Sequence, residues 1–261
     1  MKNILSLLLV VAVAGSAAAQ DVEIFRKANE AYKAGDYETA LQGYRKLAGG
    51  VSNPSLFLNL GNAAFKTGHP GWAVVYYERG LRLEPRSPDL TANLEFVRER
   101  IVDKSTEGTD WFSALVAGTY RYLSLKELLV LTSLFWFLFL GVAASLYWLD
   151  VPMTRSLGVL FSFLEAPRRE KLAALLVPAA LGLVFFAGWT GTRIHDETIP
   201  RAVVVEKEVK ATSGPGADAT VVFAVHEGTK LTVLRRSDRW AQVSLANGYS
   251  GWLPEDAIEE I

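Results

Sequence analysis

Two long apolar stretches dominate the pattern of hydrophobic and polar positions along the chain. They cover residues 128–149 and 172–192, and neither contains Asp, Glu, Lys or Arg. A helix rises about 1.5 Å per residue, so roughly 20 apolar residues cross the hydrocarbon core of a bilayer. A helix of that length in a soluble protein normally has one polar face. The pattern therefore predicts two transmembrane helices, over 128–149 and 172–194, joined by a short loop over 150–171.

The first 19 residues have the pattern of a cleavable signal peptide. Lys2 precedes an apolar run over residues 4–14, and three alanines follow at 17–19, just before Gln20. This order of charge, apolar run and small residues is typical of export signals; an uncleaved anchor is the alternative. Because two spans return the chain to the same side, we expect both soluble modules in the periplasm and the short loop in the cytoplasm of a bacterial inner membrane. The basic residues Arg168, Arg169 and Lys171 in that loop agree with the positive-inside rule.

A repeated phrase fills much of residues 20–104. It reads Ala28-Asn29-x-x-Tyr32-Lys33-x-Gly35, then Gly61-Asn62-x-x-Phe65-Lys66-x-Gly68, and in part Ala92-Asn93-x-x-Phe96. The offset of about 33 residues is close to the 34-residue tetratricopeptide period. Each glycine precedes a second helical pattern, marked by Ala40 and Tyr44 and then by Ala73 and Tyr77. The region resembles the tetratricopeptide repeat family, which implies two helix pairs and a capping helix.

That resemblance also implies a partner-binding groove. In tetratricopeptide proteins, the position of the three asparagines lies on the concave face, where it bonds the backbone of a bound peptide. The candidate groove residues are Asn29, Tyr32, Lys33, Asn62, Phe65, Lys66 and Asn93. On this interpretation the groove holds an extended, acidic segment, and Asn29→Ala with Asn62→Ala releases it without unfolding the protein. The alternative is that the asparagines bond neighbouring helices and the lysines are only solvated.

Short apolar runs of β character follow residue 202. Five strands are expected, over residues 203–205, 221–225, 230–234, 240–243 and 251–253, with a hairpin turn at Asn247-Gly248 and a final helical turn at 254–258. So many short strands in one small region predict a barrel. The phrases His226-Glu227-Gly228-Thr229, Trp240-x-x-Val243 and Gly251-Trp252-Leu253 resemble a bacterial SH3-type domain over 200–261. Such domains often bind cell-wall peptides or proteins. Trp240, Tyr249 and Trp252 are the candidate groove residues, with a core position as the alternative for Trp252 and a turn role expected for His226.

Composition narrows the chemistry further. The formal net charge is −1, so there is no overall basic field of the kind that binds nucleic acid. The chain has no cysteine, which excludes disulfides, thiolate nucleophiles and cysteine-rich zinc sites. The three histidines stand apart from one another, and no nucleophile elbow or phosphate-binding loop is found. We therefore predict no catalytic residue, no cofactor and no metal, and a protein that is not an enzyme.

The whole order is that of a multidomain membrane protein: α-helical tetratricopeptide-like repeats, an interfacial linker over 105–127, a two-helix transmembrane hairpin and an all-β SH3-type barrel. With the phrase Asn93-Leu94-Glu95-Phe96-Val97-Arg98, this order resembles BatE-type proteins of aerotolerance operons. The resemblance implies a role in stress tolerance or assembly beside von Willebrand A-domain membrane proteins and, indirectly, a MoxR-type ATPase. The first hypothesis is a non-enzymatic, membrane-anchored scaffold that binds proteins on the periplasmic side. The alternative is an envelope module whose SH3-type domain binds peptidoglycan; a sensor acting through the cytoplasmic loop is a weaker third.

Overall fold

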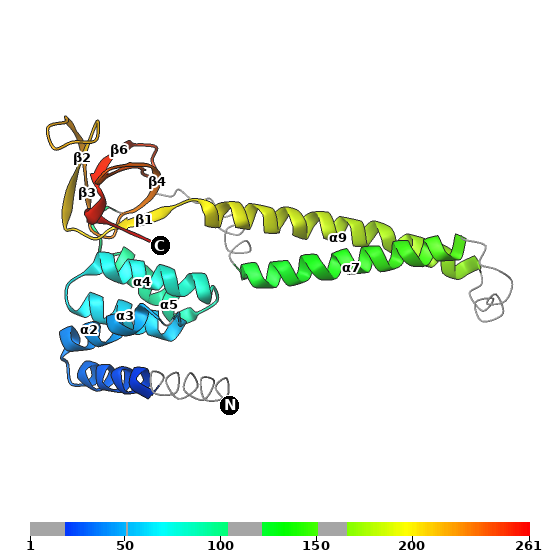
Figure 1. Cartoon of the computed structure of the whole chain (residues 1–261), viewed down its shortest axis with the longest axis horizontal. Coiled ribbons are helices and arrows are strands. Elements are labelled where there is room, and N and C mark those ends of the chain that lie inside the picture. Colours follow the sequence, from blue (N-terminus) through cyan, green and yellow to red (C-terminus); the bar gives the residue numbers. More distant parts are fainter. Residues whose placement is uncertain (1–18, 51, 104–121, 151–165) are drawn as a thin grey trace, which may run out of the picture. The chain divides into compact units, whose positions relative to one another are not determined.

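The computed structural model describes residues 19–50, 52–103, 122–150 and 166–261 (Figure 1). The predicted signal peptide as far as residue 18, most of the predicted linker and the loop over 151–165 lie outside the described residues. Within the described part, the chain divides into two compact units. One combines the helices before residue 104 with the strands after residue 200, and the other contains two long helices.

The first unit begins with paired helices. A helix covers residues 19–33, and four more follow: α2 (Tyr37–Ala48), α3 (Pro54–Lys66), α4 (Pro70–Leu83) and α5 (Pro88–Arg98). Gly35 and Gly68 connect the members of each pair at φ angles of +85° and +81°, in the left-handed region that glycine adopts without a steric penalty. The result is two helix pairs and a fifth helix, as the repeated phrase predicts. Membership of the tetratricopeptide family itself stays a prediction.

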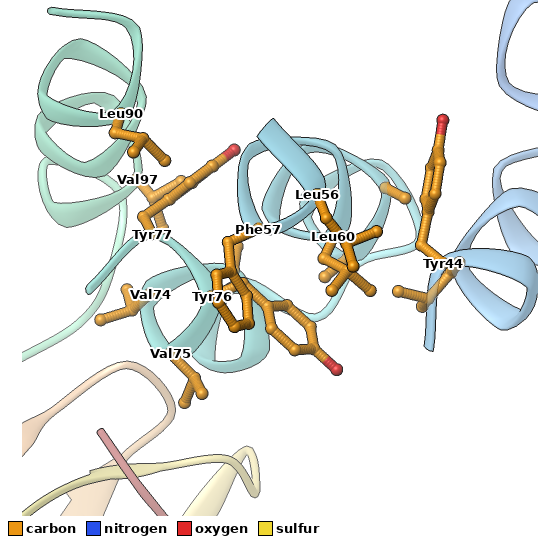
Figure 2. Packing of buried hydrophobic residues seen from close by; sticks show 14 of the residues in the cluster. Tyr44, Leu56, Phe57, Leu60, Val74, Val75, Tyr76, Tyr77, Leu90 and Val97 are labelled. Carbon is orange, nitrogen blue, oxygen red and sulfur yellow. The ribbon is translucent and has the colours of Figure 1, made fainter. Parts of the chain in front are cut away.

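Close packing between these helices depends on small residues at the crossing points. Ala40 and Ala73 are fully buried, and a Cβ atom on Gly61 would lie 2.2 Å from the ring of Tyr77. Figure 2 shows the core around these helices, with Tyr44 and Tyr77 among the largest buried side chains. The repeated small and aromatic positions are therefore packing partners, since each aromatic ring fills the space that a small residue leaves.

The same unit contains a seven-stranded antiparallel sheet with strand order β3-β2-β6-β5-β4-β1-β7, in which the edge strands β3 and β7 are not paired with each other. Closure into a barrel stays a prediction, and we use the word barrel only as the name of this sheet. Its strands are β1 (Arg201–Val204), β2 (Glu208–Thr212), β3 (Val221–His226), β4 (Lys230–Ser237), β5 (Trp240–Ser244), β6 (Ser250–Pro254) and β7 (Ile258–Glu260). The expected helical turn is present as the 3-10 helix η1 (Glu255–Ala257). The sequence prediction missed β2 and β7, because β2 carries one large apolar side chain, Val209, and β7 is three residues long.

The second unit is a pair of helices, α7 (Leu125–Asp150) and α9 (Ala166–Thr198), each containing a segment long and apolar enough to cross a membrane. They contact each other through the Thr132 and Thr190 hydroxyls, 2.9 Å apart, and through stacked rings of Phe135 and Phe186. Gly182 lies at the contact, because a Cβ atom there would be 2.2 Å from the Phe135 ring.

Three other glycines of these helices do not take part in this contact. These are Gly141, Gly188 and Gly191, and a Cβ atom on any of them would meet no heavy atom within 4 Å.

Both helices are also longer than predicted. At the start of α7, the Glu127 carboxylate accepts hydrogen bonds from the backbone N–H and hydroxyl of Ser124, both at 2.9 Å, which forms a capping box and explains why the helix begins before residue 128.

Candidate binding surfaces and the junction between repeats and barrel

The side chains of the three repeated asparagines make hydrogen bonds inside the helical array. The Asn29 and Asn62 side-chain oxygens accept hydrogen bonds from the hydroxyls of Tyr44 and Tyr77, each at 2.7 Å. The amide of Asn93 donates to the same Asn62 oxygen at 2.8 Å. Burial raises the pKa of Tyr44 to about 12, in keeping with a hydroxyl that stays protonated and donates. These asparagines therefore bond neighbouring helices, and the side-chain oxygens of Asn29 and Asn62 are occupied within the fold.

Aromatic and basic side chains of the same helices make two groups of contacts. The Tyr32 and Tyr37 rings are 5.0 Å apart, and the Lys66 ammonium lies 5.8 Å from the Tyr37 ring. In the other group, the rings of Phe65 and Phe96 are 5.5 Å apart, and the Arg100 guanidinium lies 3.4 Å from the Phe96 ring. We call Tyr32, Tyr37, Phe65, Lys66, Phe96 and Arg100 the aromatic–basic stripe.

The stripe combines predicted residues with others that the sequence analysis missed. Tyr32, Phe65 and Lys66 are predicted groove residues, whereas Lys33 is exposed and makes none of the ring contacts of the stripe. Phe96 is 45% exposed although it is a large apolar residue, so the Phe65–Phe96 ring pair is partly open to solvent. The signal that could have identified Phe96 is its place in the third copy of the repeated phrase. Tyr37 and Arg100 have no such periodic signal.

On the barrel, the predicted groove aromatics do not gather at one surface. In the β5–β6 hairpin, Trp240 is paired with Pro254 and Gln242 with Trp252, so both tryptophans are on one face. That face is opposite the core, which receives Ala241, Val243 and Leu253.

Trp240 lines a hollow of about 520 Å³ together with Arg239, Pro254, Glu255 and Asp256. Trp252 is only 6% exposed, and the Arg235 guanidinium lies 5.2 Å from its ring. Tyr249 is 63% exposed, and the centroid of its ring lies 6.2 Å from that of Phe223. The Phe223 ring also packs near Gly251 on the core side. Of the three predicted residues, only Trp240 lines this hollow.

The helices and the barrel meet through the turn that follows β3. The Asp103 carboxylate accepts hydrogen bonds from the His226 backbone N–H and the Thr229 hydroxyl, both at 2.8 Å, and contacts His226 Nδ1 at 3.1 Å. Burial by itself would raise the pKa of Asp103, but these hydrogen bonds together hold the pKa below its ordinary value of 3.8. His226 is the last residue of β3 and starts this turn by accepting a hydrogen bond from the Thr229 N–H, and the turn is a docking element.

A second contact at this junction brings two backbones close together. The Gly71 N–H donates a 3.0 Å hydrogen bond to the Glu227 carboxylate, which is buried. A Cβ atom on Gly71 would lie 2.5 Å from the Val204 carbonyl oxygen. Val203 and Ile261 of the barrel belong to the same apolar cluster as the helices. The barrel and the repeats therefore share a core.

Ion pairs surround the junction. The Glu78 carboxylate, with only 15% of its side chain exposed, bonds Arg98 at 2.5 Å and Lys230 at 2.8 Å. Burial lowers the pKa of Lys230, and Glu78 opposes that shift by favouring the charged form. Arg79 adds contacts to the Glu259 carboxylate and the Glu260 carbonyl oxygen. The Glu78–Arg98 pair joins α4 to α5, whereas the Glu78–Lys230 pair and the Arg79 contacts join the helices to the barrel and fix the orientation of one on the other.

Among the described residues, no group of three or more His, Asp or Glu side chains has a geometry that holds a metal ion.

Comparison with known families identifies the C-terminal part. Residues 213–259 match the family described as bacterial SH3 domain. The match begins after β2 and extends into β7, so β1 and β2 lie outside it. Comparison with curated proteins gives no match. The C-terminal region thus contains a bacterial SH3 domain, a class compatible with binding either peptidoglycan or proteins, and here it is packed against a helical array.

Proposed function

We propose that this protein is a non-enzymatic, membrane-anchored scaffold that holds a partner protein on its helical repeats. The observation that carries this proposal is the aromatic–basic stripe. Its ring and cation contacts link the helix over 19–33 with α2, α3 and α5, so the stripe crosses both helix pairs. If Phe96 served only the internal core, its ring would not be exposed beside the Arg100 guanidinium.

The stripe suits a peptide that carries carboxylates. Lys66 and Arg100 are both exposed, and each lies beside a ring. Cations held in place lose less side-chain freedom when they bind a carboxylate, and exposed rings add apolar contact area. The overall charge of −1 contributes no attraction for an acidic peptide, so this local arrangement supplies it.

The surrounding architecture supports a fixed position at a membrane. α7 and α9 supply two candidate spans, and the joined repeats and SH3 domain supply one body that carries the stripe. We place that body in the periplasm and the chain in a BatE-like assembly, which favours von Willebrand A-domain membrane proteins as direct partners and a MoxR-type ATPase as an indirect one.

In-cell crosslinking tests this proposal. The full-length protein would be crosslinked in its native cell and purified, and its partners identified by mass spectrometry, for the wild type and for Lys66→Glu with Arg100→Glu. We expect von Willebrand A-domain proteins with the wild type and their loss with the double variant. Lys46→Glu, an exposed lysine on α2 outside the stripe, is the matched control and should retain the partners. Equal recovery with the double variant would contradict binding at the stripe.

A second candidate function is favoured by the family match and by the hollow beside Trp240. Bacterial SH3 domains commonly bind peptidoglycan or proteins, and a hollow with an indole wall and charged rim suits a wall peptide. Co-sedimentation of the detergent-solubilised full chain with purified sacculi tests this. Pelleting that is lost in Trp240→Ala and kept in Val222→Ala would support wall binding, and no pelleting of the wild type would exclude it.

A further inference from the structure

The turn that follows β3 presents several polar groups to a single carboxylate. Asp103 Oδ2 lies 2.8 Å from both the His226 backbone N–H and the Thr229 hydroxyl, and Asp103 Oδ1 lies 3.1 Å from His226 Nδ1. Hydrogen bonds to an ionised oxygen are roughly twice as strong as neutral ones. The Thr229 hydroxyl also lies 2.7 Å from the His226 carbonyl oxygen, so it keeps a partner when no carboxylate is present. We call these groups of His226 and Thr229 the carboxylate cradle.

Backbone hydrogen bonds within the barrel hold the carboxylate cradle in place. The Glu227 N–H donates to the Lys207 carbonyl oxygen at 3.2 Å, and the Gly228 N–H donates to the Val204 carbonyl oxygen at 2.8 Å. Gly228 adopts a φ of +89°, in the left-handed region that glycine enters without a steric penalty. None of these contacts involves Asp103, so the donors stay in position without it. A site that is ordered beforehand loses little conformational freedom when it binds.

The carboxylate in the cradle is held far less firmly by its own part of the chain. α5 ends at Arg98, and neither Val102 nor Asp103 makes a backbone hydrogen bond to another described residue. Val102 is 70% exposed, and the side chains of Asp103 and His226 are 33% and 30% exposed. Solutes therefore reach this contact. The other hydrogen bonds and ion pairs between helices and barrel do not involve Asp103, so the junction persists when its carboxylate leaves.

We propose that the cradle is a carboxylate-binding site of the SH3 domain, which Asp103 fills as an intramolecular ligand until an acidic side chain of a protein partner replaces it. Arg100 of the aromatic–basic stripe precedes Asp103 by three residues, which span at most about 11 Å, so an acidic segment on the stripe reaches the cradle. The partner's identity rests on the proposed function, whereas the cradle does not. Glu208, opposite His226 on β2, repels Asp103 and an incoming carboxylate alike.

Histidine labelling isolates the cradle, because the chain has only three histidines. The full-length protein in detergent, with isotopically labelled histidine, gives one backbone amide signal each for His69, His195 and His226, and His226→Gln identifies the third. Formate would be titrated into Asp103→Ala, with chloride at equal ionic strength as the control. We expect the His226 signal to shift and saturate with formate, and the other two signals to stay where they are in the wild type. Asp103→Asn, which keeps the side-chain shape, should need several-fold more formate.

Further arms define the ligand and the site. In the wild type, the same formate concentration should leave the His226 signal unchanged, because the tethered Asp103 carboxylate has a far higher effective concentration. In Asp103→Ala, a blocked tripeptide with a central aspartate should act as formate does, and its asparagine analogue should not. Adding Thr229→Val should weaken formate binding several-fold, whereas Thr220→Val, at an exposed position, should not.

A last comparison separates the cradle from the stripe. Lys66→Glu with Arg100→Glu, added to Asp103→Ala, should leave the formate response unchanged, so failure of partner binding at the stripe and failure of the cradle are distinguishable. No shift of the His226 signal, or equal shifts of all three histidine signals, would overturn the cradle. A response to formate without any response to the aspartate tripeptide would overturn exchange with a partner's side chain, since the site would then accept a free ion only.

Discussion

The backbone N–H of His226 donates a 2.8 Å hydrogen bond to the Asp103 carboxylate, across 123 residues of sequence. This bond joins the end of the helical array to the turn after β3. It means that the candidate spans are an insertion between two parts of one folded body, since both of the joined residues belong to the same compact unit. The binding surfaces of the helices and of the barrel therefore keep a fixed relation to each other.

Gly71→Ala should weaken the junction. Its new Cβ atom would lie 2.5 Å from the Val204 carbonyl oxygen, and that oxygen is held by a 2.8 Å hydrogen bond from the Gly228 N–H. Overpacking against backbone of this kind costs about 1–3 kcal/mol. Thermal unfolding of the purified protein would show the loss. Gly49→Ala is the control, because a Cβ atom there meets nothing within 4 Å, and an equal effect of both changes would contradict the close approach.

Acid should remove the contribution of Asp103 to stability. Its folded-state pKa lies below the ordinary value of 3.8, so the contribution is present above that value and is lost as the pH falls through the folded-state pKa. We expect Asp103→Asn to lower the free energy of unfolding by about 1–3 kcal/mol near pH 6, and the gap to the wild type to shrink below about pH 4. Denaturant titrations at several pH values measure this.

Two comparisons isolate that effect. Asp218→Asn, in the exposed loop between β2 and β3, should show no gap to the wild type at either pH. Glu227 is present in both the wild type and the Asp103 variant, so its own contribution cancels. Burial raises the Glu227 pKa, so the contribution of Glu227 to stability has the opposite pH dependence to that of Asp103. It is greatest below the ordinary value of 4.5 and is lost as the pH rises. A gap that is independent of pH would contradict the role of the Asp103 charge.

Asn62→Ala should lower the stability of the helical repeats even when no partner is bound. It removes the acceptor of the Tyr77 hydroxyl and of the Asn93 amide. An unpaired buried hydroxyl costs about 1–3 kcal/mol. The expectation that Asn29→Ala with Asn62→Ala spares the fold is therefore replaced by an expected loss of stability. Tyr77→Phe should make Asn62→Ala less costly, since no hydroxyl is then left unpaired. Asn59→Ala on the same helix is the control, and strict additivity in the Asn62–Tyr77 double-mutant cycle would contradict the coupling.

Gly182→Val should separate α7 from α9. A side chain there would meet the Phe135 ring, which is stacked on Phe186 with centroids 5.2 Å apart. Thr132→Cys with Thr190→Cys provides the measurement, because the two hydroxyl oxygens are 2.9 Å apart and the chain has no other cysteine. We expect efficient disulfide formation in this background and a clear loss on adding Gly182→Val. Gly188→Val should leave the yield unchanged, and equal yields in all three proteins would contradict the contact.

Local signals determined the elements of this fold. The charge-free stretches predict α7 and α9, and the repeated glycine and asparagine phrase predicts the helix pairs. The phrases around Trp240 and Trp252 indicate the SH3 domain, which the family match confirms over residues 213–259. These signals depend on neighbours a few residues apart or on a fixed repeat, and both are visible along the chain. The membrane crossing, the signal peptide and the BatE-like partners remain predictions.

Tertiary structure alone decided which of these residues meet. Asp103 has no sequence pattern that points to His226, and Gly182 has none that points to Phe135. Trp240 and Tyr249 were predicted to line one groove, yet Trp240 lines the hollow and Tyr249 neighbours the Phe223 ring. By itself, the sequence determined the modules and their order, because periodicity and composition control secondary structure locally. The junction, the stripe and the hollow required the folded structure, because contacts between distant residues arise from packing that leaves no period in the chain.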